Sequence, residues 1–420
     1  MIESFTNWDE IPLGDICEIA TGKFDANHAT QNGKYRFYTC AYEYMFCDTN
    51  RFNGESIILP GNGANVGEVF YYKGEFDAYQ RTYVLSDIKC IPKFLFYHLK
   101  FKWKDINSDK QYGSATNYIR MGNFTDYLVP FPPFAEQQRI VYKIEELFSE
   151  LDKGIETLKT AQQQLKVYRQ AVLKYAFEGK FTNSKNQFKI YQLGEIVDIV
   201  SGSTPKDLNE YLGSGLFQFY KVSDMNLEDN KVEMKSSNHL ISEQNIKKLK
   251  LKVYPEGTII FPKRGGAILT NKKRMLSKPS SFDLNLMGVL PNENINKYFL
   301  YYWFLKLDLS KIYDGSSVPQ INNKNIYPLQ FPLFSIENQL LIVQEIESRL
   351  SVCDKIEESI EQGLQQAEAL RQSILKKAFE GKLVPQDLND EPASVLLERI
   401  KAERQKAQPE KKIKTKKVKA

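Results

Sequence analysis

The chain contains one long sequence block twice, and this internal repeat constrains its fold more than any other feature. The first copy runs from Glu136 to Lys180, and an offset of 202 residues maps it onto Asn338–Lys382. Both copies contain Arg-Gln, then Leu-Lys, and end in Ala-Phe-Glu-Gly-Lys. A repeat of this length indicates that the same structural unit is built twice along the chain.

Each copy has the heptad pattern of a long helix that packs against a partner. No proline interrupts either copy, and the glycine followed by lysine at each end is typical of a helix stop. The predicted seam of the first helix comprises Ile144, Leu151, Leu158, Leu165 and Val172, with companions Leu147, Gly154, Ala161, Tyr168 and Tyr175. That of the second comprises Ile346, Cys353, Ile360, Ala367 and Ile374, with companions Ile356, Gly363 and Leu370. At about 1.5–3 kcal/mol per buried Leu or Ile, these seams predict that the two helices pack together.

The segments that precede the helices are also repeated. Ile11–Gly22 aligns with Tyr191–Gly202 at an offset of 180, whereas from Ile57 onward the offset is 202. The second segment therefore carries 22 extra residues between Gly202 and Ile259. Short runs of Tyr, Phe, Ile and Val cut by Gly, Asn and Pro predict short strands, and a packed helix is expected at Pro92–Lys104 and at Asn296–Leu309. This pattern favours an α+β fold for both segments.

The order globule, helix, globule, helix predicts how the repeats are arranged. Both seams are buried most simply if the second helix runs antiparallel to the first, as an antiparallel coiled coil with a globule at each end and a pseudo-two-fold, circular arrangement. A helix of this length spans about 60 Å. Such a molecule suits the recognition of two half-sites on DNA, which symmetric dimers read at a separation of about 34–36 Å. Because the globules differ in sequence, the two half-sites should differ as well.

The expected boundaries follow from the repeat. They are 1–133 and 181–333 for the globular domains, 134–180 and 334–382 for the helices, and 383–420 for the C-terminal part. Within that last part we expect a helix over Val395–Lys406. The lysine-rich stretch Lys411–Lys419 is expected to be disordered, with non-specific contact to phosphates as its secondary interpretation.

Composition narrows the class of protein. The chain has 420 residues, which suits two domains with connectors, and a formal net charge of +5, which permits a nucleic-acid partner without requiring one. Apolar runs fall short of the ~20 residues of a membrane span, and we expect no membrane partner. The five cysteines form no Cys-x-x-Cys pair, which favours a reducing cytoplasm.

The sequence lacks a convincing catalytic or metal-binding motif. Phe131-Pro-Pro-Phe134 differs by one residue from the Asn/Asp-Pro-Pro-Tyr/Phe loop of adenine methyltransferases, and Phe131 cannot accept the hydrogens of an amino group. Gly61-Asn-Gly63 lacks the third glycine of a dinucleotide-binding loop and is interpreted as a turn. His28, His98 and His239 lie far apart in sequence and do not have the spacing of metal ligands. We therefore expect no catalytic, cofactor or metal site in this chain.

The arrangement resembles the specificity subunit of type I restriction-modification systems over residues 9–400. The resemblance is carried by Glu136-Gln-Gln-Arg-Ile-Val141, by both Arg-Gln-x-x-Leu-Lys-x-Ala-Phe-Glu-Gly-Lys blocks, by Leu-Gly-x-Ile near each globule's start and by Gly202-Ser-Thr-Pro205. The second helix departs from the pattern, since it opens Ile336-Glu-Asn-Gln-Leu-Leu and could begin differently.

The resemblance implies a function and a set of partners. Each globule would be a target recognition domain on double-stranded DNA, and the helices would be a spacer on which two modification subunits dock. Those subunits would carry the methyltransferase site and use S-adenosylmethionine to methylate adenine. Restriction subunits would join for translocation and cleavage driven by ATP, with Mg²⁺. This chain would then direct the chemistry of its partners without performing it.

Candidate DNA-binding residues are those whose side chains recognise base edges or phosphates. In the first globule we expect Lys34, Arg36, Asn62, Tyr79, Gln80, Arg81, Asn117, Tyr118 and Arg120. In the second we expect Lys263, Arg264, Lys272, Lys273, Arg274, Gln320, Asn322, Asn323 and Lys324. Each could equally be a solvated surface residue. For partner docking, Arg169, Gln170, Arg371 and Gln372 are predicted to lie off the seam in both copies, where an ordinary helix surface is the alternative.

Two other functions compete with DNA recognition for a partner enzyme. A self-contained methyltransferase would need a cofactor fold and an Asn/Asp-Pro-Pro motif, which the sequence lacks. A solitary DNA-binding or coiled-coil scaffold protein without a restriction role would need only the helices, but it leaves two dissimilar globules unexplained.

Overall fold

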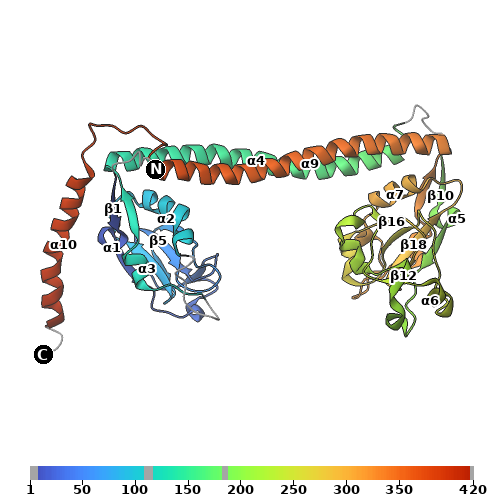
Figure 1. Cartoon of the computed structure of the whole chain (residues 1–420), viewed down its shortest axis with the longest axis horizontal. Helices are drawn as coiled ribbons and strands as arrows, with labels where there is room; N and C mark the ends of the chain where they lie inside the picture. The colour runs from blue at the N-terminus through green and yellow to red at the C-terminus, as the bar shows by residue number, and fades with distance from the viewer. Residues whose placement is uncertain (1–7, 108–116, 182–187, 417–420) are drawn as a thin grey trace. The chain divides into compact units, whose positions relative to one another are not determined.

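The computed structural model of the protein describes residues 8–107, 117–181 and 188–416, with side chains as far as residue 406. The chain divides into two compact units (Figure 1). Unit 1 comprises residues 1–158 and 362–420, and unit 2 comprises residues 159–361. Both long helices contribute to both units, so each unit contains one globule and a segment of each helix.

The globule of unit 1 is an α+β fold with three sheets. They are a four-stranded sheet of order β2-β8-β5-β6, a three-stranded sheet of order β4-β3-β7 and a β1-β9 ribbon. The strands are β1 Asp9–Pro12, β2 Glu18–Thr21, β3 Tyr35–Tyr38, β4 Met45–Cys47, β5 Glu55–Pro60, β6 Phe70–Lys73, β7 Phe76–Ala78, β8 Thr82–Ser86 and β9 Leu128–Phe131. The helices are α1 Leu13–Ile16, α2 Pro92–Asn107 and α3 Met121–Thr125.

The globule of unit 2 repeats this topology. Its sheets have the orders β11-β18-β15-β16-β13, β14-β12-β17 and β10-β19. The strands are β10 Lys189–Gln192, β11 Val197–Ser201, β12 Leu212–Tyr220, β13 Glu233–Met234, β14 Leu240–Ile241, β15 Ile259–Pro262, β16 Arg274–Leu276, β17 Ser281–Phe282, β18 Leu286–Pro291 and β19 Gln330–Leu333. The helices are α5 Leu193–Ile196, α6 Glu243–Lys248, α7 Lys297–Lys306 and α8 Asn323–Ile326. The predicted insertion contains β13, which extends the main sheet, and α6.

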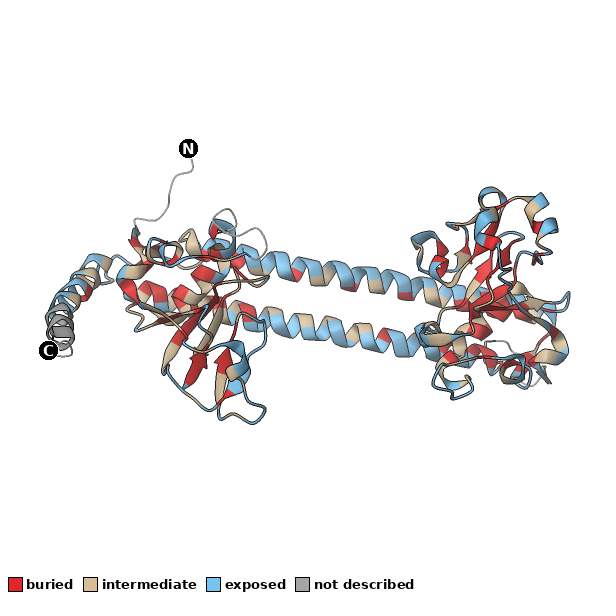
Figure 2. Ribbon diagram, turned by 90° about the horizontal axis from the view of Figure 1, so that it is seen from below, coloured by how far each residue is buried: buried red, intermediate tan, exposed pale blue. Residues whose placement is uncertain are grey.

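A central strand buried on both faces organises each globule, because the main sheet has a core on either side. In β5, Ile57 and Leu59 join a core with the helix residue Trp103, while Ile58 joins a second core on the opposite face. In β15, Ile259 and Phe261 face a core with α7, and Ile260 faces the other. Successive side chains of a strand point to opposite faces, so a strand covered on both sides is a continuous apolar run. Figure 2 shows buried residues, in red, gathered along the strands inside each globule.

The two long helices, α4 Phe134–Phe177 and α9 Ile336–Phe379, begin and end at equivalent residues. Gly179 and Gly381 follow them with φ of +72° and +67°, the left-handed conformation in which glycine ends a helix. At the start, the buried amide of Gln137 accepts from Ile91 N at 3.0 Å and donates to the Pro132 carbonyl at 2.9 Å. Gln339 makes the same two kinds of bond in unit 2. The shared glutamine explains why the altered opening of α9 does not shift its first residue.

The main line of the predicted seam is confirmed, whereas its companion line was wrong by one position at most residues, with Leu147 and Gly363 as exceptions that do contact the partner helix. Ile144, Leu165 and Val172 are buried in α4, as are Cys353, Ile360, Ala367 and Ile374 in α9. The predicted companions Tyr168 and Leu370 are 45% and 51% exposed. The second line follows four residues after the first and contains Phe148, Arg169 and Ala176 in α4 and Arg371 and Ala378 in α9. Residues three and four positions along a helix flank the same stripe, so the heptad spacing alone did not decide between them.

Within each unit the helix segments pack antiparallel, as predicted. In unit 1, Ile144 and Phe148 share a core with Ile374 and Ala378, and Leu158 lies beside Gly363, where an added Cβ would be 3.1 Å from Leu158 Cδ1. Residue numbers therefore rise along α4 as they fall along α9.

The same order holds in unit 2. Leu173 and Phe177 share a core with Ile342 and Ile346, and Arg169 lies farther back along α4, where it pairs with Asp354 of α9. Residue numbers again rise along α4 as they fall along α9, so the two helix segments of unit 2 are also antiparallel.

A third helix, α10 Ala393–Lys416, packs on the globule of unit 1. Ile400 is buried in the core that includes Ile11 and Leu13. Arg404 donates to the Gly14 carbonyl at 2.8 Å and to Asp15 at 3.3 Å. The helix predicted over Val395–Lys406 is confirmed. The expected disorder of the lysine-rich stretch is corrected as far as Lys416, because the helix backbone continues from turns that the globule already holds; residues 417–420 lie outside the described part.

Candidate nucleic-acid interface

In unit 1 the loop after β5 pairs with the segment that leads into α3. Gly63 N donates to the Asn117 carbonyl at 2.8 Å and Ile119 N to the Gly61 carbonyl at 3.0 Å, which places Asn62 opposite Tyr118. Gly61 N in turn donates to the Arg81 carbonyl at 2.9 Å, which joins the turn before β8. We call Gly61–Gly63, Gln80, Arg81 and Asn117–Ile119 the first loop junction. Backbone hydrogen bonds hold its three loop segments in fixed positions relative to one another.

The first loop junction brings together side chains that recognise nucleic acid. A cavity of 370 Å³ there is lined by residues that include Asn62, Gln80, Arg81 and Tyr118, four of the residues predicted to bind DNA. Arg120 follows directly, and its Nη2 donates to the Tyr118 hydroxyl at 3.2 Å. An amide, a guanidinium and a phenol on one rigid framework are the groups that hydrogen-bond base edges and phosphates.

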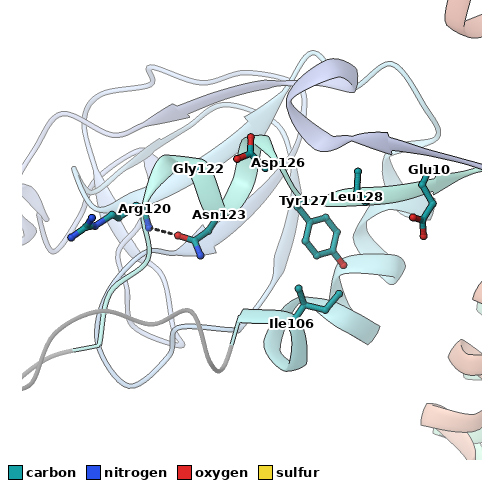
Figure 3. A pocket seen from close by; sticks show the side chains of 8 residues that line it. All are labelled: Glu10, Ile106, Arg120, Gly122, Asn123, Asp126, Tyr127 and Leu128. Carbon is teal, nitrogen blue, oxygen red and sulfur yellow. Dashed lines mark hydrogen bonds between the residues drawn. The ribbon is translucent and has the colours of Figure 1, made fainter.

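The start of α3 fixes the direction of Arg120. Its backbone N donates to Asn123 Oδ1 at 2.9 Å, which caps the helix. Figure 3 shows the adjoining pocket, in which the Arg120 side chain extends away from Tyr127 and Ile106. In unit 2, Asn322 N donates to Asn325 Oδ1 at 2.9 Å at the start of α8, which is the same cap.

Unit 2 contains a second loop junction with the same backbone bonds. Lys263 N donates to the Asn285 carbonyl at 2.8 Å, Ile321 N to the Lys263 carbonyl at 2.9 Å and Gly265 N to the Pro319 carbonyl at 2.8 Å. Arg264 lies opposite Gln320, where unit 1 has Asn62 opposite Tyr118. We call Lys263–Gly265, Asn285 and Pro319–Ile321 the second loop junction. The framework is common to both units, and the side chains on it differ.

The second loop junction is basic. Lys263 donates to Ser201 Oγ at 2.8 Å, and partial burial lowers its pKa, to which the charge of Arg264 adds. With the Gln320 amide oriented so that its oxygen faces the guanidinium, Oε1 accepts from Arg264 Nη2 at 2.8 Å and from Nε at 2.9 Å. Arg264 itself is exposed. The junction therefore presents a guanidinium whose orientation the protein fixes.

The backbone bonds also correct the repeat offset near this site. The sequence offset of 202 maps Arg81 onto Asp283, but Leu85 pairs with Ile57 as Val289 pairs with Ile259. The structural equivalent of Arg81 is thus Asn285. Sequence reasoning missed Asn285 because a short insertion between β15 and β18 shifts the offset to 204.

Two predicted DNA-binding residues of unit 2 are corrected. Lys273 is 1% exposed, and its Nζ donates to Asn271 Oδ1 and to the Leu307 carbonyl, each at 2.6 Å. Burial lowers the pKa of Lys273 to about 8. Arg274 is half-buried and donates to the carbonyls of Asn230, Lys273 and Met225. Lys273 is thus buried and bonded to the protein itself, which the sequence did not indicate, and the donors of the half-buried Arg274 are bonded to backbone carbonyls.

The remaining candidates lie on the surface outside the paired segments. Lys34 is exposed, Tyr79 is half-buried, Lys272 donates to Asn226, and Asn323 and Lys324 form the exposed first turn of α8. Arg36 lies between the rings of Tyr44 and Tyr72, with its Cζ 4.2 Å and 4.4 Å from their centroids. The sequence analysis did not single out the exposed aromatic residues Tyr42, Tyr44 and Phe46 beside it.

The predicted docking residues divide into two kinds. Arg169 and Arg371 do not lie off the seam: Arg169 pairs with Asp354 at 2.6 Å and with Glu357 at 2.9 Å, and Arg371 pairs with Asp152. They link the two helices, at equivalent positions of the repeat. Gln170 and Gln372 are exposed, and Gln372 lines a cavity of 950 Å³ between the helix pair and the globule of unit 1.

The described residues offer no sign of a metal site or of a membrane span. They contain no cluster of three or more His, Cys, Asp or Glu side chains that could bind a metal ion. Phe131 is buried in β9, in line with a structural role for the Phe-Pro-Pro-Phe segment. Among the helices of the described part, none is long and apolar enough to cross a bilayer.

Comparison with known proteins identifies the family. Residues 6–166 and 185–366 match the type I restriction modification DNA specificity domain. The chain is 30% identical to the type I restriction enzyme EcoDI specificity subunit of Escherichia coli over 95% of both chains. It is 24% identical to the MjaVIII specificity subunit of Methanocaldococcus jannaschii over 91% of this chain and 94% of the relative.

Solved structures share the fold. A chain from a study of complex assembly and conformational transition of the type I R-M system aligns with a TM-score of 0.72 at 16% identity, over 89% of this chain and 98% of that one. The HsdS subunit from Thermoanaerobacter tengcongensis aligns with a TM-score of 0.55 at 18% identity, over 90% and 98%. The duplicated globules, the paired helices and these matches agree: the chain belongs to the family of type I restriction-modification specificity subunits.

Proposed function

We propose that this chain is the sequence-specific DNA recognition subunit of a type I restriction-modification complex and reads a bipartite, asymmetric target. The observation that carries the proposal is the repetition of one backbone framework, the loop junction, with different side chains in the two units. Equal frameworks present reading groups in the same way, and unequal side chains select different bases. Each loop junction would contact one half of the target.

The chemistry is proposed to reside on partner subunits. Two modification subunits would bind to the helix pair and methylate adenine with S-adenosylmethionine, and restriction subunits would use ATP and Mg²⁺ for translocation and cleavage. This chain would hold no cofactor and would act in the cytoplasm. We propose the boundaries 1–133 and 181–333 for the recognition domains, 134–180 and 334–382 for the spacer helices, and 383–420 for the C-terminal part.

Partner docking is proposed to use exposed helix residues beside the interhelical ion pairs. Gln170 and Gln372 occupy equivalent positions in the two units and are exposed, so two copies of one partner could bind in the same way. Arg169 and Arg371 would act indirectly by holding the two helices together.

The test is a measurement of target choice. The chain is co-expressed with its modification subunits in a host without other adenine methylation, and modified adenines are mapped across the genome. The proposal predicts one bipartite motif, absent when this gene is deleted. Methylation without sequence preference would instead favour a scaffold role, and methyl transfer by the purified chain alone would contradict the division of labour.

A further inference from the structure

Arg264 is held in one orientation before any ligand arrives. Gln320 Oε1 accepts from both Nε and Nη2, so one edge of the planar guanidinium is already bonded to protein. Arginine has five N–H donors in a fixed fork. Within the described part of the chain, Nη1 has no hydrogen-bond partner, which leaves three donors on the outer end of the fork. That end offers Nη1 and Nη2 side by side.

The loop that carries Gln320 is itself ordered by a carboxylate. Asp314 Oδ1 accepts from Gln320 N at 3.2 Å and from Ser316 N at 3.2 Å, and Asp314 N donates to the Gln320 carbonyl at 3.0 Å. Hydrogen bonds from Ser316 lower the pKa of Asp314, so it is ionised at neutral pH. Asp314 thus orders the loop that positions Gln320, and Gln320 in turn orients the guanidinium of Arg264.

A guanidinium held by its side edge presents the geometry of a base reader. A phosphate accepts either the point charge of a lysine or the fork of an arginine, and it does so from many directions around the backbone. A bidentate contact to guanine O6 and N7 in the major groove is made by arginine or lysine, and a guanidinium held in one plane supplies its two parallel N–H donors already aligned. An acceptor that holds the opposite edge reduces the rotamer entropy lost on binding.

We infer that Arg264 reads a guanine in the half-site contacted by unit 2, with Gln320 as its positioning residue. This inference rests on the proposed function and deepens it. Unit 1 has Asn62 and Tyr118 at the equivalent positions, which supply no guanidinium fork there. This arginine–glutamine pair is therefore particular to unit 2.

The test compares Arg264→Lys with Arg264→Gln in the assembled complex with its modification subunits. Binding is measured on duplexes that carry the target and on duplexes with each base pair of the unit 2 half-site replaced in turn. Lysine keeps the charge and loses the fork. We expect Arg264→Lys to lose roughly 5- to 150-fold discrimination at one G·C pair, with the salt dependence of binding unchanged. Arg264→Gln should lose the same discrimination with little change in the salt slope, because that slope reports the phosphates that the protein neutralises.

The positioning role of Gln320 has a separate readout. Gln320→Ala should weaken discrimination at the same G·C pair, whereas Gln320→Glu, which keeps an acceptor oxygen, should retain it. Lys324→Ala is the control: it is an exposed cation on α8 and should weaken binding to every duplex alike.

The outcomes separate the possibilities. Unchanged discrimination in both Arg264→Lys and Arg264→Gln would overturn the inference and assign Arg264 to a phosphate. Loss of discrimination at several separated base pairs would overturn it too, because it would indicate a disturbed fold. If the wild-type complex itself binds all duplexes equally, the proposed function fails and not the assignment of Arg264 alone.

Discussion

Replacing Gly202 with alanine should destabilise unit 2 and disturb its loop junction. Gly202 follows β11, and its Cα faces the backbone of the Phe282–Asp283 segment. An added Cβ would lie 2.0 Å from the Asp283 carbonyl oxygen and 2.4 Å from that of Phe282. Those carbonyls belong to the segment that leads to Asn285, whose own carbonyl accepts from Lys263 N. The substitution therefore disturbs the Asn285 side of the second loop junction.

The magnitude follows from the contact. Overpacking of a tight site destabilises a protein by about 1–3 kcal/mol. Here the added Cβ meets backbone atoms, which cannot rotate away as a side chain could, so we expect a cost near the top of that range. Replacing glycine with alanine recovers about 0.4–1 kcal/mol of this cost, because alanine lowers the conformational entropy of the unfolded chain. We expect a net loss of about 2 kcal/mol in the free energy of unfolding of unit 2, roughly a 30-fold change in the folded-to-unfolded ratio.

The assay is urea titration followed by amide hydrogen exchange, because exchange of β15 and β18 reports unit 2 separately from unit 1. Gly266→Ala is the matched control. It lies beside the same junction, and an added Cβ there meets no atom within 4 Å. Protection of β15 and β18 equal to wild type in Gly202→Ala would refute the steric argument.

Three further predictions concern unit 1. Burial, helped by the charge of Lys102, lowers the pKa of His98 to about 3. In the unfolded chain the same imidazole is protonated below about pH 6.5. Acidification from neutral pH to pH 5 therefore favours the unfolded state and lowers the free energy of unfolding by about 2 kcal/mol. Urea titrations of His98→Phe should show a flatter pH dependence than wild type, and an equal dependence would contradict the burial argument. A double-mutant cycle of Arg371→Ala and Asp152→Ala should give a coupling of about 0.5 kcal/mol that disappears in 1 M salt, and zero coupling at low salt would exclude an energetic role. Ile400→Ala should weaken the packing of α10 by about 2–4 kcal/mol, so faster amide exchange confined to α10 is expected and unchanged exchange would be inconsistent with its docking.

The sequence predicted much of the architecture because its strongest patterns are periodic and occur twice. Both helices, their antiparallel pairing and their glycine stops were predicted correctly. The companion line of the seam was correct only in part, because positions three and four residues along a helix flank the same stripe. Arg169 and Arg371 then looked like surface residues, although both make ion pairs across the helix pair.

The candidate site was only partly predictable from residue type. Asn62, Arg81 and Tyr118 were each chosen by residue type, and the structure brings them together because turns beside the central strands converge. The internal bonds of Lys273 and Arg274 could not be recognised, since the residue type alone does not distinguish a cation bonded within the protein from one that contacts DNA. Their partners are backbone carbonyls and, for Lys273, the side-chain oxygen of Asn271, and no residue pattern reveals these bonds. The pairing of Arg264 with Gln320 likewise depends on backbone bonds between distant segments.

The most direct test of the account transplants one loop junction's reading side chains onto the other framework. Asn62→Arg with Tyr118→Gln gives unit 1 the side chains of unit 2 at equivalent positions. The methylated motif is then mapped in cells that express the variant with its modification subunits. The account predicts a change confined to one half of the motif, with the other half and the spacing between them retained. A motif that stays the same, or that changes in both halves, would contradict the claim that each loop junction reads its own half of the target.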